Sequence, residues 1–529
     1  MSSTAGRARV RSSLLSAGLL FGLSLLLRLL FFQGFVLGDD AEEFLLVDHI
    51  SHAGIDFQVY RHLEYRFPIW GLNLWSHRWL GATELAFFLP TVLLSASFAP
   101  LGFAWLRRLG YGVGAAFLGG LLVATAPFEI VLGTLRANDL ILAWFLALGL
   151  LAFVAFDQRP IRQGVALAFA LWLAFAAKLW ALYALPALGI HYLVRVVRAG
   201  EWRGPTSFGL ASLLLHGATA AFWKHHMGAW LPFLADYSAT YPIEPSQLPA
   251  VLTAYLRILF VGSTLGTTLF GAMPALLLAV LALTLLAWLR AGRRGACLDR
   301  ASLALLVYLA AFFLLLELFP TTFRFDRFYS VPRIFRYLAP LSFPMTLLAA
   351  KLLLDLGSSG PLERRSPGAV RVAAFAALVA LGLYQAAEAT RPGRLYRAGL
   401  LGVVAALERS CPPELLVEQR LGTILQYAYL RPRCPHTRVS PYLLDRPAAE
   451  YEHWLTEHER ELPEGAVLVS GIGSYVHYGC PQCGFRLEGF EQPLSQAWTP
   501  AGDIEVEGAE AVRLWRLSRR RPEAPEPSG

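Results

Sequence analysis

The chain has 529 residues, of which 56% are hydrophobic and only 16% are charged, and its mean hydropathy is +0.48. A soluble domain typically carries about 25% charged residues and cannot bury so much apolar surface, so the composition excludes an ordinary soluble globular protein. The net charge of +8 would suit nucleic acid, but most basic residues lie in short loops between apolar runs, where they set membrane orientation instead. We therefore expect no nucleic-acid binding and a lipid bilayer as the surroundings.

The apolar residues form runs close to the roughly 20 residues that one membrane crossing needs. Backbone amides in hydrocarbon must be paired internally, so each run is expected to be a helix. The sequence predicts a mainly α, polytopic transmembrane helical bundle of about eleven spans, at 14–32, 85–106, 109–128, 140–156, 163–177, 179–194, 205–223, 268–289, 301–319, 337–354 and 372–389. The uncharged stretch 258–289 could hold two spans, but we favour one span preceded by an interfacial or re-entrant segment at 248–266.

Basic residues predict the orientation. Arg7, Arg9 and Arg11 precede the first span, which predicts a cytoplasmic N-terminus and a retained anchor in the cytoplasmic (inner) membrane of a bacterium. Alternation then places five basic loops on the same side, namely 107–108, 159–162, 195–203, 290–294 and 364–365. The loops 34–84, 224–257 and 320–336 and the region after 390 are therefore expected outside the cytoplasm.

An acidic run, Gly38-Asp39-Asp40-Ala41-Glu42-Glu43, follows the first span directly. Carboxylates crowded at a membrane exit are costly to desolvate, and crowding raises their pKa values. Asp39 and Asp40 are the candidate catalytic residues, and the alternative is a solvated acidic loop. The same loop offers side chains suited to a sugar or an acceptor, which are Glu42, Arg61, His62, Tyr65, Arg66 and Trp70.

Further charges lie at the predicted outer ends of later spans. They are the candidate donor-phosphate ligands Arg136, Asp139, Lys178, Arg333 and Arg336. Cations and carboxylates at one membrane face can bind a leaving phosphate and deprotonate an acceptor. The alternatives are that Arg136 and Asp139 pair and cap a helix, that Lys178 only reaches the interface, and that Arg336 only sets topology.

From about residue 390 the composition becomes that of a soluble domain. We predict an extracytoplasmic α/β domain at 390–518, with a helix at 448–462 and strands at 467–471 and 512–517, and a disordered tail at 519–529. Four cysteines fall in this region, Cys411, Cys434, Cys480 and Cys483, and they favour disulfides on the oxidising side. Half a zinc site or a redox pair are the alternatives for Cys480 and Cys483, and the connectivity stays open.

These motifs, in this order, resemble the GT-C superfamily of membrane glycosyltransferases, most closely glycosyltransferase family 39, the protein O-mannosyltransferases and lipid A aminoarabinose transferases. The matching segments are 38–41, 67–70 with 80–84, 107–110, 136–139, Lys178 and 336–340, within roughly residues 15–355. The resemblance implies that 1–389 is a GT-C-like catalytic domain. It also implies transfer of a sugar from a polyprenyl-phosphate donor to a protein, lipid or glycan acceptor outside the cytoplasm.

The resemblance further assigns roles. Asp39 matches the carboxylate that acts as base or positions the acceptor, and Asp40 stands where the family usually has Glu, so the two roles could be exchanged. Arg136 and Asp139 match the motif near the donor phosphate, and Lys178 and Arg336 resemble the groups that neutralise it. Metal dependence stays open, because some enzymes of this family need a divalent ion and others do not. The pair His225 and His226 is more typical of residues at the membrane–water interface than of metal ligands.

Three other functions remain as alternatives. A transporter or flippase of lipid-linked sugars would show internal repeats or broken helices with charges at mid-membrane, and the sequence shows no repeat. An O-antigen ligase or polymerase would depend on Arg and His in a large late loop, whereas here the acidic loop comes first. A non-catalytic assembly protein would tolerate the loss of Asp39 and Asp40.

Overall fold

The computed structural model describes residues 2–35, 39–54, 66–232, 241–242, 253–257, 259, 272–290, 298–318, 329–330, 335–356, 367–431, 433–442, 459–470, 498–504 and 512–518. The chain forms two compact units. The first comprises 1–32, 56–72 and 89–389, and the second comprises 33–55, 73–88 and 390–529. Residues 33–55 and 73–88 were predicted to belong to the transmembrane domain, whereas the structure groups them with the C-terminal region.

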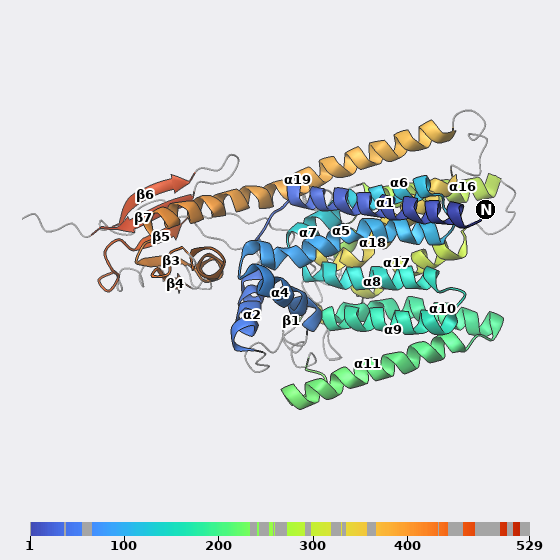
Figure 1. The fold of residues 1–529 in the computed structure, drawn as a ribbon, viewed down its shortest axis with the longest axis horizontal. Helices are drawn as coiled ribbons and strands as arrows, with labels where there is room; N and C mark the ends of the chain where they lie inside the picture. Colours follow the sequence, from blue (N-terminus) through green and yellow to red (C-terminus); the bar gives the residue numbers. More distant parts are fainter. Residues whose placement is uncertain are drawn as a thin grey trace, which may run out of the picture. The chain divides into compact units, whose positions relative to one another are not determined.

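Helices occupy all eleven ranges in which spans were predicted. They are α1 (Ser2–Leu30), α5 (Glu84–Arg108), α6 (Val113–Ala124) with α7 (Pro127–Thr134), α8 (Asn138–Ala155), α9 (Pro160–Ala177), η1 (Leu179–Ala184) with α10 (Leu185–Ala199), α11 (Arg203–Met227), α16 (Met273–Arg290), α17 (Arg300–Leu318), α18 (Ala339–Leu356) and α19 (Pro367–Ser410). Within the first unit α9 packs against both α8 and α11, and the three helices lie side by side (Figure 1).

Eight of the described helices are long and apolar enough to cross a membrane, and the bent pair α6 and α7 makes a ninth candidate. Of the two remaining predicted spans, α16 has a shorter apolar stretch, Met273–Leu286, and α11 is a continuous helix of 25 residues. Helix α18 has almost no exposed side chain and is the central helix of the first unit. The protein is thus an integral membrane protein built on a helical bundle.

The predicted single span 109–128 is in fact broken. Helix α6 ends at Ala124, and α7 begins at Pro127 with its axis bent by 52°. Proline has no backbone N–H and favours the first turn of a helix, so a new helix begins there. The carbonyl of Ala124 at the break accepts a hydrogen bond from Nη1 of the buried Arg28, at 2.6 Å.

Arg28 belongs to a buried polar network around this break. Its Nε donates to Ser95 Oγ at 2.9 Å, and Ser95 Oγ donates to the backbone carbonyl of Glu129 at 2.7 Å. The Glu129 carboxylate accepts a hydrogen bond from Ser342 at 2.9 Å and lies within electrostatic range of Arg28. Polar groups in an apolar interior are costly unless paired, so this network ties α1, α5, α7 and α18 together.

Replacing Arg28 with methionine is expected to destabilise the first unit strongly. The substitution leaves the Ala124 carbonyl without its donor and Glu129 without a nearby cation, and breaking such a buried arrangement costs roughly 3–5 kcal/mol. The measurement is thermal unfolding of the purified protein in detergent, with Arg11→Met at an exposed position of the same helix as control. Equal midpoints for the two variants would contradict a structural role for Arg28.

In the second unit, aromatic side chains form a small core. Phe35, Phe44, Phe87 and Phe88 are buried, and their ring centroids lie 5.1–5.7 Å apart in the contacts that join them. These residues come from the segment after α1, from α2 (Asp39–Ala53) and from the start of α5. The core therefore explains why 33–55 and 73–88 belong to this unit.

A five-stranded sheet with the order β4-β3-β5-β7-β6 forms the C-terminal part. The strands are β3 (Glu414–Glu418), β4 (Arg438–Tyr442), β5 (Val467–Ser470), β6 (Trp498–Ile504) and β7 (Val512–Leu517). β3 is parallel to both β4 and β5, and α20 (Gln419–Ile424) with the π-helical turn η7 (Leu425–Leu430) connects β3 to β4. The sheet prolines Pro441 and Pro500 lie on the edge strands, where a missing N–H is tolerated.

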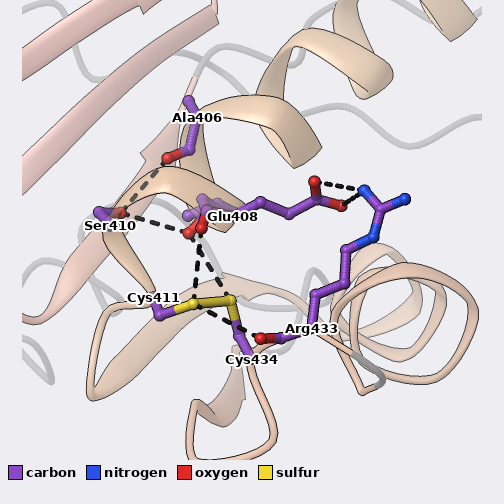
Figure 2. Close-up of a disulfide and its surroundings, with 7 residues drawn as sticks. Ala406, Glu408, Ser410, Cys411, Arg433 and Cys434 are labelled. Carbon is purple, nitrogen blue, oxygen red and sulfur yellow. Dashed lines mark hydrogen bonds and ion pairs between the residues drawn. A yellow bond between two sulfur atoms is a disulfide. The ribbon is translucent and has the colours of Figure 1, made fainter.

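The structure shows one disulfide among the four cysteines of the C-terminal region. Cys411 and Cys434 form a disulfide between the end of α19 and the segment before β4, with Cα atoms 5.4 Å apart (Figure 2). Arg433 forms an ion pair with Glu408 beside it. Cys480 and Cys483, the predicted tail at 519–529 and most of 248–266 lie outside the described residues. Of the predicted helix at 448–462 the structure describes only 459–462, which form a turn and not a helix.

Removing this disulfide is expected to destabilise the second unit by about 3 kcal/mol, because a cross-link over a separation of 23 residues restricts the unfolded chain by that amount. The change is Cys411→Ser with Cys434→Ser, and the measurement is denaturant unfolding with and without reductant. The reductant should lower the unfolding midpoint of the wild type more than that of the double variant, which lacks the Cys411–Cys434 bond. Cys297→Ser is the control, and a wild-type curve insensitive to complete reduction would refute the prediction.

Candidate active site

The first unit holds a buried carboxylate beside two cations. Asp139 lies in the first turn of α8 and is 0% exposed. Lys178 Nζ donates a hydrogen bond to Asp139 Oδ1 at 2.6 Å, and Arg336 Nε lies 3.6 Å from Oδ2. The sequence analysis assigned all three residues to one site, and the structure brings them together. The ion-pair partners of Asp139, Lys178 and Arg336, come from two other segments of the chain. Asp139 therefore does more than pair with Arg136 to cap a helix.

Lys178 lies where a helix stops. Helix α9 ends at Ala177, Lys178 adopts an extended backbone conformation, and the 3-10 helix η1 begins at Leu179. The break turns the Lys178 side chain into the protein, where it is 7% exposed. A lysine that only reached the lipid–water interface would keep its ammonium in water, so this lysine does not have that role.

Aromatic rings surround the cations. Lys178 Nζ lies 4.2 Å from the centroid of the Tyr337 ring, and the Arg336 guanidinium carbon lies 5.9 Å from it. The rings of Tyr337 and Trp180 pack at 5.6 Å. An aromatic face stabilises a desolvated cation by roughly 2 kcal/mol, so these rings help to keep the cations charged in a buried position.

Arg136 has an unusual backbone conformation. Its φ is +52°, in the left-handed region that favours glycine, and its side chain is 2% exposed. Arg136 follows Leu135, the C-cap of α7, and Asn138 then begins α8. A non-glycine residue in this conformation costs roughly 1–3 kcal/mol, and such residues concentrate at functional sites. The turn between α7 and α8 therefore positions both Arg136 and Asp139.

This arrangement suits an anion. Arg66 lies within electrostatic range of Lys178 and brings a third cation, so the interacting groups are three cations, Lys178, Arg336 and Arg66, and one carboxylate, Asp139. Cations held by packing before a ligand arrives can stabilise charge that develops on a phosphate without further reorganisation. We call Asp139, Lys178 and Arg336 the cation cluster below.

The structure describes the other predicted site residues only in part. The backbone of Asp39, Asp40 and Glu42 forms the first turn of α2, which belongs to the second unit, and their side chains are not described. Trp70 lies half-buried in α4 (Phe67–Leu80). Arg61, His62, Tyr65 and Arg333 lie outside the described residues.

Two groups of residues near the site and the helix break were not predicted from the sequence. Trp180 and Tyr337 were not singled out, although each lies one or two residues from a predicted cation, which was the available signal. Arg28 and Glu129 were also missed. Their signal was an ionisable residue inside or at the end of an apolar run, which is rare and costly in a membrane.

The described residues include no group of three or more His, Cys, Asp or Glu side chains placed to hold a metal ion. His225 and His226 both lie exposed at the end of α11, with ring centroids 4.7 Å apart. The neighbouring Lys224 donates to the Gly228 carbonyl, as expected for a helix C-terminus.

The described residues thus combine a bundle of apolar helices, a cation cluster at helix ends and a small C-terminal sheet. Among solved structures, the chain is similar to ArnT from Cupriavidus metallidurans in the apo state. The TM-score is 0.52, the identity is 15%, and the match covers 88% of this chain and 93% of that one.

It is also similar to the same ArnT bound to undecaprenyl phosphate, with a TM-score of 0.50 and 14% identity, over 94% of this chain and 97% of that one. No family model and no curated protein sequence matches the chain. The comparison thus confirms the predicted fold, over nearly the whole length of the chain.

Proposed function

We propose that this protein is a glycosyltransferase that moves a sugar from a polyprenyl-phosphate donor to an acceptor at the outer face of the membrane. The observation that carries the proposal is the cation cluster, buried among aromatic rings in a fold shared with ArnT. That ArnT has been solved with undecaprenyl phosphate, a lipid of the class that the proposed reaction would release.

In the proposed reaction an acceptor oxygen or nitrogen attacks the anomeric carbon of the sugar. A new bond forms to that carbon while its bond to the phosphate oxygen breaks, and the electron pair leaves with the phosphate. Lys178 and Arg336 bind the phosphate and offset the negative charge that develops on it. Asp139 positions both cations, because it contacts each of them.

The proton of the acceptor needs a base. Asp39 is the proposed base and Asp40 the proposed helper, with the roles exchangeable, because a carboxylate at the membrane exit can have a raised pKa and accept a proton there. The proposed acceptor and sugar contacts are Glu42, Arg61, His62, Tyr65, Arg66 and Trp70, and the proposed further phosphate ligands are Arg136 and Arg333.

The direct test incubates purified protein in detergent with polyprenyl phosphates carrying a hexose, a pentose or an aminopentose, together with lipid, peptide and glycan acceptors. The expected result is release of polyprenyl phosphate with one donor, and loss of release in Lys178→Gln. The matched control is Lys224→Gln, an exposed lysine outside the cluster. Release at equal rates from both variants would overturn the assignment of the cluster.

Transport of a lipid-linked sugar is the second candidate, and one observation favours it. The pair α6 and α7 is a broken span, a feature that transporters use to build a substrate site. The assay separates the two functions when it is run in sealed vesicles with the donor in one leaflet. Appearance of intact donor in the other leaflet, without release of polyprenyl phosphate, would identify a flippase, and turnover restricted to a polyprenyl-diphosphate donor would identify a ligase or polymerase.

A further inference from the structure

A second feature of the first unit lies away from the cation cluster. Helices α8, α9, α10 and α17 line a half-open cavity of about 190 Å³. Its lining is almost wholly apolar and includes Phe145 and Phe153 of α8, six and fourteen residues beyond Asp139. At about 1.5 Å per helical residue, the cavity begins roughly 9 Å below the cluster and extends away from it.

The size and lining of the cavity call for a hydrocarbon ligand. A cavity needs only about 10–15 Å³ to hold one water molecule, but an apolar cavity of about 150 Å³ stays dry and binds hydrocarbon. An unfilled apolar cavity of this size would also leave its lining without many van der Waals contacts. Filling it with a lipid chain restores those contacts.

The length of the cavity matches one leaflet of a bilayer. The lining residues extend over 145–153 on α8 and 184–194 on η1 and α10, which corresponds to about 12–15 Å along these helices. The hydrocarbon core of a bilayer is about 30 Å thick, so one leaflet is about 15 Å. A chain lying in the cavity therefore reaches from the middle of the membrane to its surface.

Polar groups mark the surface end of the cavity. Arg300 lines it at the start of α17, and its side chain is 57% exposed, with one ion pair to Asp157 at 3.3 Å. His191 also lines it, and its buried Nε2 atom has no hydrogen-bond partner among the residues that the structure describes. The neighbouring Arg195 is engaged by Asp157, Gln163 and Glu201, so it supports the rim, whereas the Arg300 side chain is largely exposed.

We propose that this cavity binds one acyl chain of an anionic phospholipid, with the phosphate of the headgroup at Arg300 and His191. A hydrocarbon chain without a polar group at the surface end of the cavity would leave His191 Nε2 without a hydrogen-bond partner. The phosphate or the glycerol oxygens of a phospholipid would provide that partner. Basic residues at the ends of helices attract anionic lipids by about 1 kcal/mol each. The site is separate from the proposed glycosyl-transfer site and does not depend on that activity.

The test measures lipid retention. The protein is reconstituted in vesicles that contain equal amounts of phosphatidylglycerol and phosphatidylcholine, extracted in detergent, and analysed by mass spectrometry of the intact protein–lipid complex. The wild type is expected to retain one phosphatidylglycerol in preference to phosphatidylcholine. Arg300→Gln should keep a bound lipid but lose about fivefold in this preference, the factor that corresponds to about 1 kcal/mol.

Gly149→Leu tests the cavity itself. A Cβ atom at Gly149 meets only ordinary contacts, with Ala170 and Leu167 at 3.7 and 3.8 Å, so the larger side chain can fill the cavity without a clash. Bound phospholipid should be lost. Gly189→Leu on α10 is the matched control, because a Cβ there meets nothing within 4 Å and the residue does not line the cavity. Should Gly149→Leu fail to purify as a monodisperse protein, Ala187→Phe fills the cavity from α10.

Three outcomes would overturn the proposal. They are equal retention of the two phospholipids by the wild type, unchanged retention in Gly149→Leu and Ala187→Phe, and displacement of the bound phospholipid by added polyprenyl phosphate. The last outcome would assign the cavity to the tail of the glycosyl donor. Failure of glycosyl transfer with retention intact would instead reject only the proposed function.

Discussion

Asp139→Asn is expected to lower kcat/KM for glycosyl transfer by about 10²–10³, because catalytic stabilisation of this size depends on charged groups held in place before the reaction. The neutral amide keeps the shape of the side chain but loses the charge that holds Lys178 at 2.6 Å and attracts Arg336 at 3.6 Å. Both cations would then repel each other without a carboxylate between them. The measurement is the initial rate of polyprenyl phosphate release over a range of donor concentrations.

A double-mutant cycle distinguishes this positioning role from general damage. Asp139→Asn and Lys178→Gln should each reduce activity, and the double variant should lose far less than the product of the two effects, because the residues act as a unit. The thermal midpoint of each variant reports on folding. Multiplicative effects on activity would show that the two residues act independently, and would contradict the assignment.

Asp39→Asn is expected to reduce kcat by about 10²–10⁴, the usual contribution of general acid–base catalysis. The amide cannot accept the proton of the acceptor, whereas donor binding depends on other groups. The donor KM should therefore stay nearly constant while kcat falls. Asp40→Asn, measured in parallel, assigns the roles, since the larger loss identifies the base.

Glu464→Gln is the control for this pair of variants, since it removes an exposed carboxylate in the turn before β5. The pH dependence adds a readout that a structural role would not produce. Loss of the base should remove the acidic limb of the pH–rate profile. Full kcat in both Asp39→Asn and Asp40→Asn would show that neither carboxylate is the base and would overturn their assignment.

Much of the fold could be predicted because membrane insertion depends on local composition. A run of about 20 apolar residues needs no information about its neighbours to form a span, so helices stand in all eleven predicted ranges. The cluster residues were also predictable, since Lys178 and Asp139 interrupt or adjoin such runs. The C-terminal sheet includes both strands predicted from the sequence, at 467–471 and 512–517, which the structure places at 467–470 and 512–517.

Only the tertiary structure decided which side chains and segments are in contact. Whether Asp139 contacts Arg136 or Lys178 depends on the rotation of α8 and on the break after α9, and neither is encoded in hydropathy. The pairing of Cys411 with Cys434 and the joining of 33–55 and 73–88 to the C-terminal unit likewise depend on packing between distant segments. The sequence by itself determined that this chain enters a membrane and where its charges stand along the helices. The structure decided their partners, because contacts across a bundle follow from helix rotation and register, which residues far apart in the chain set together.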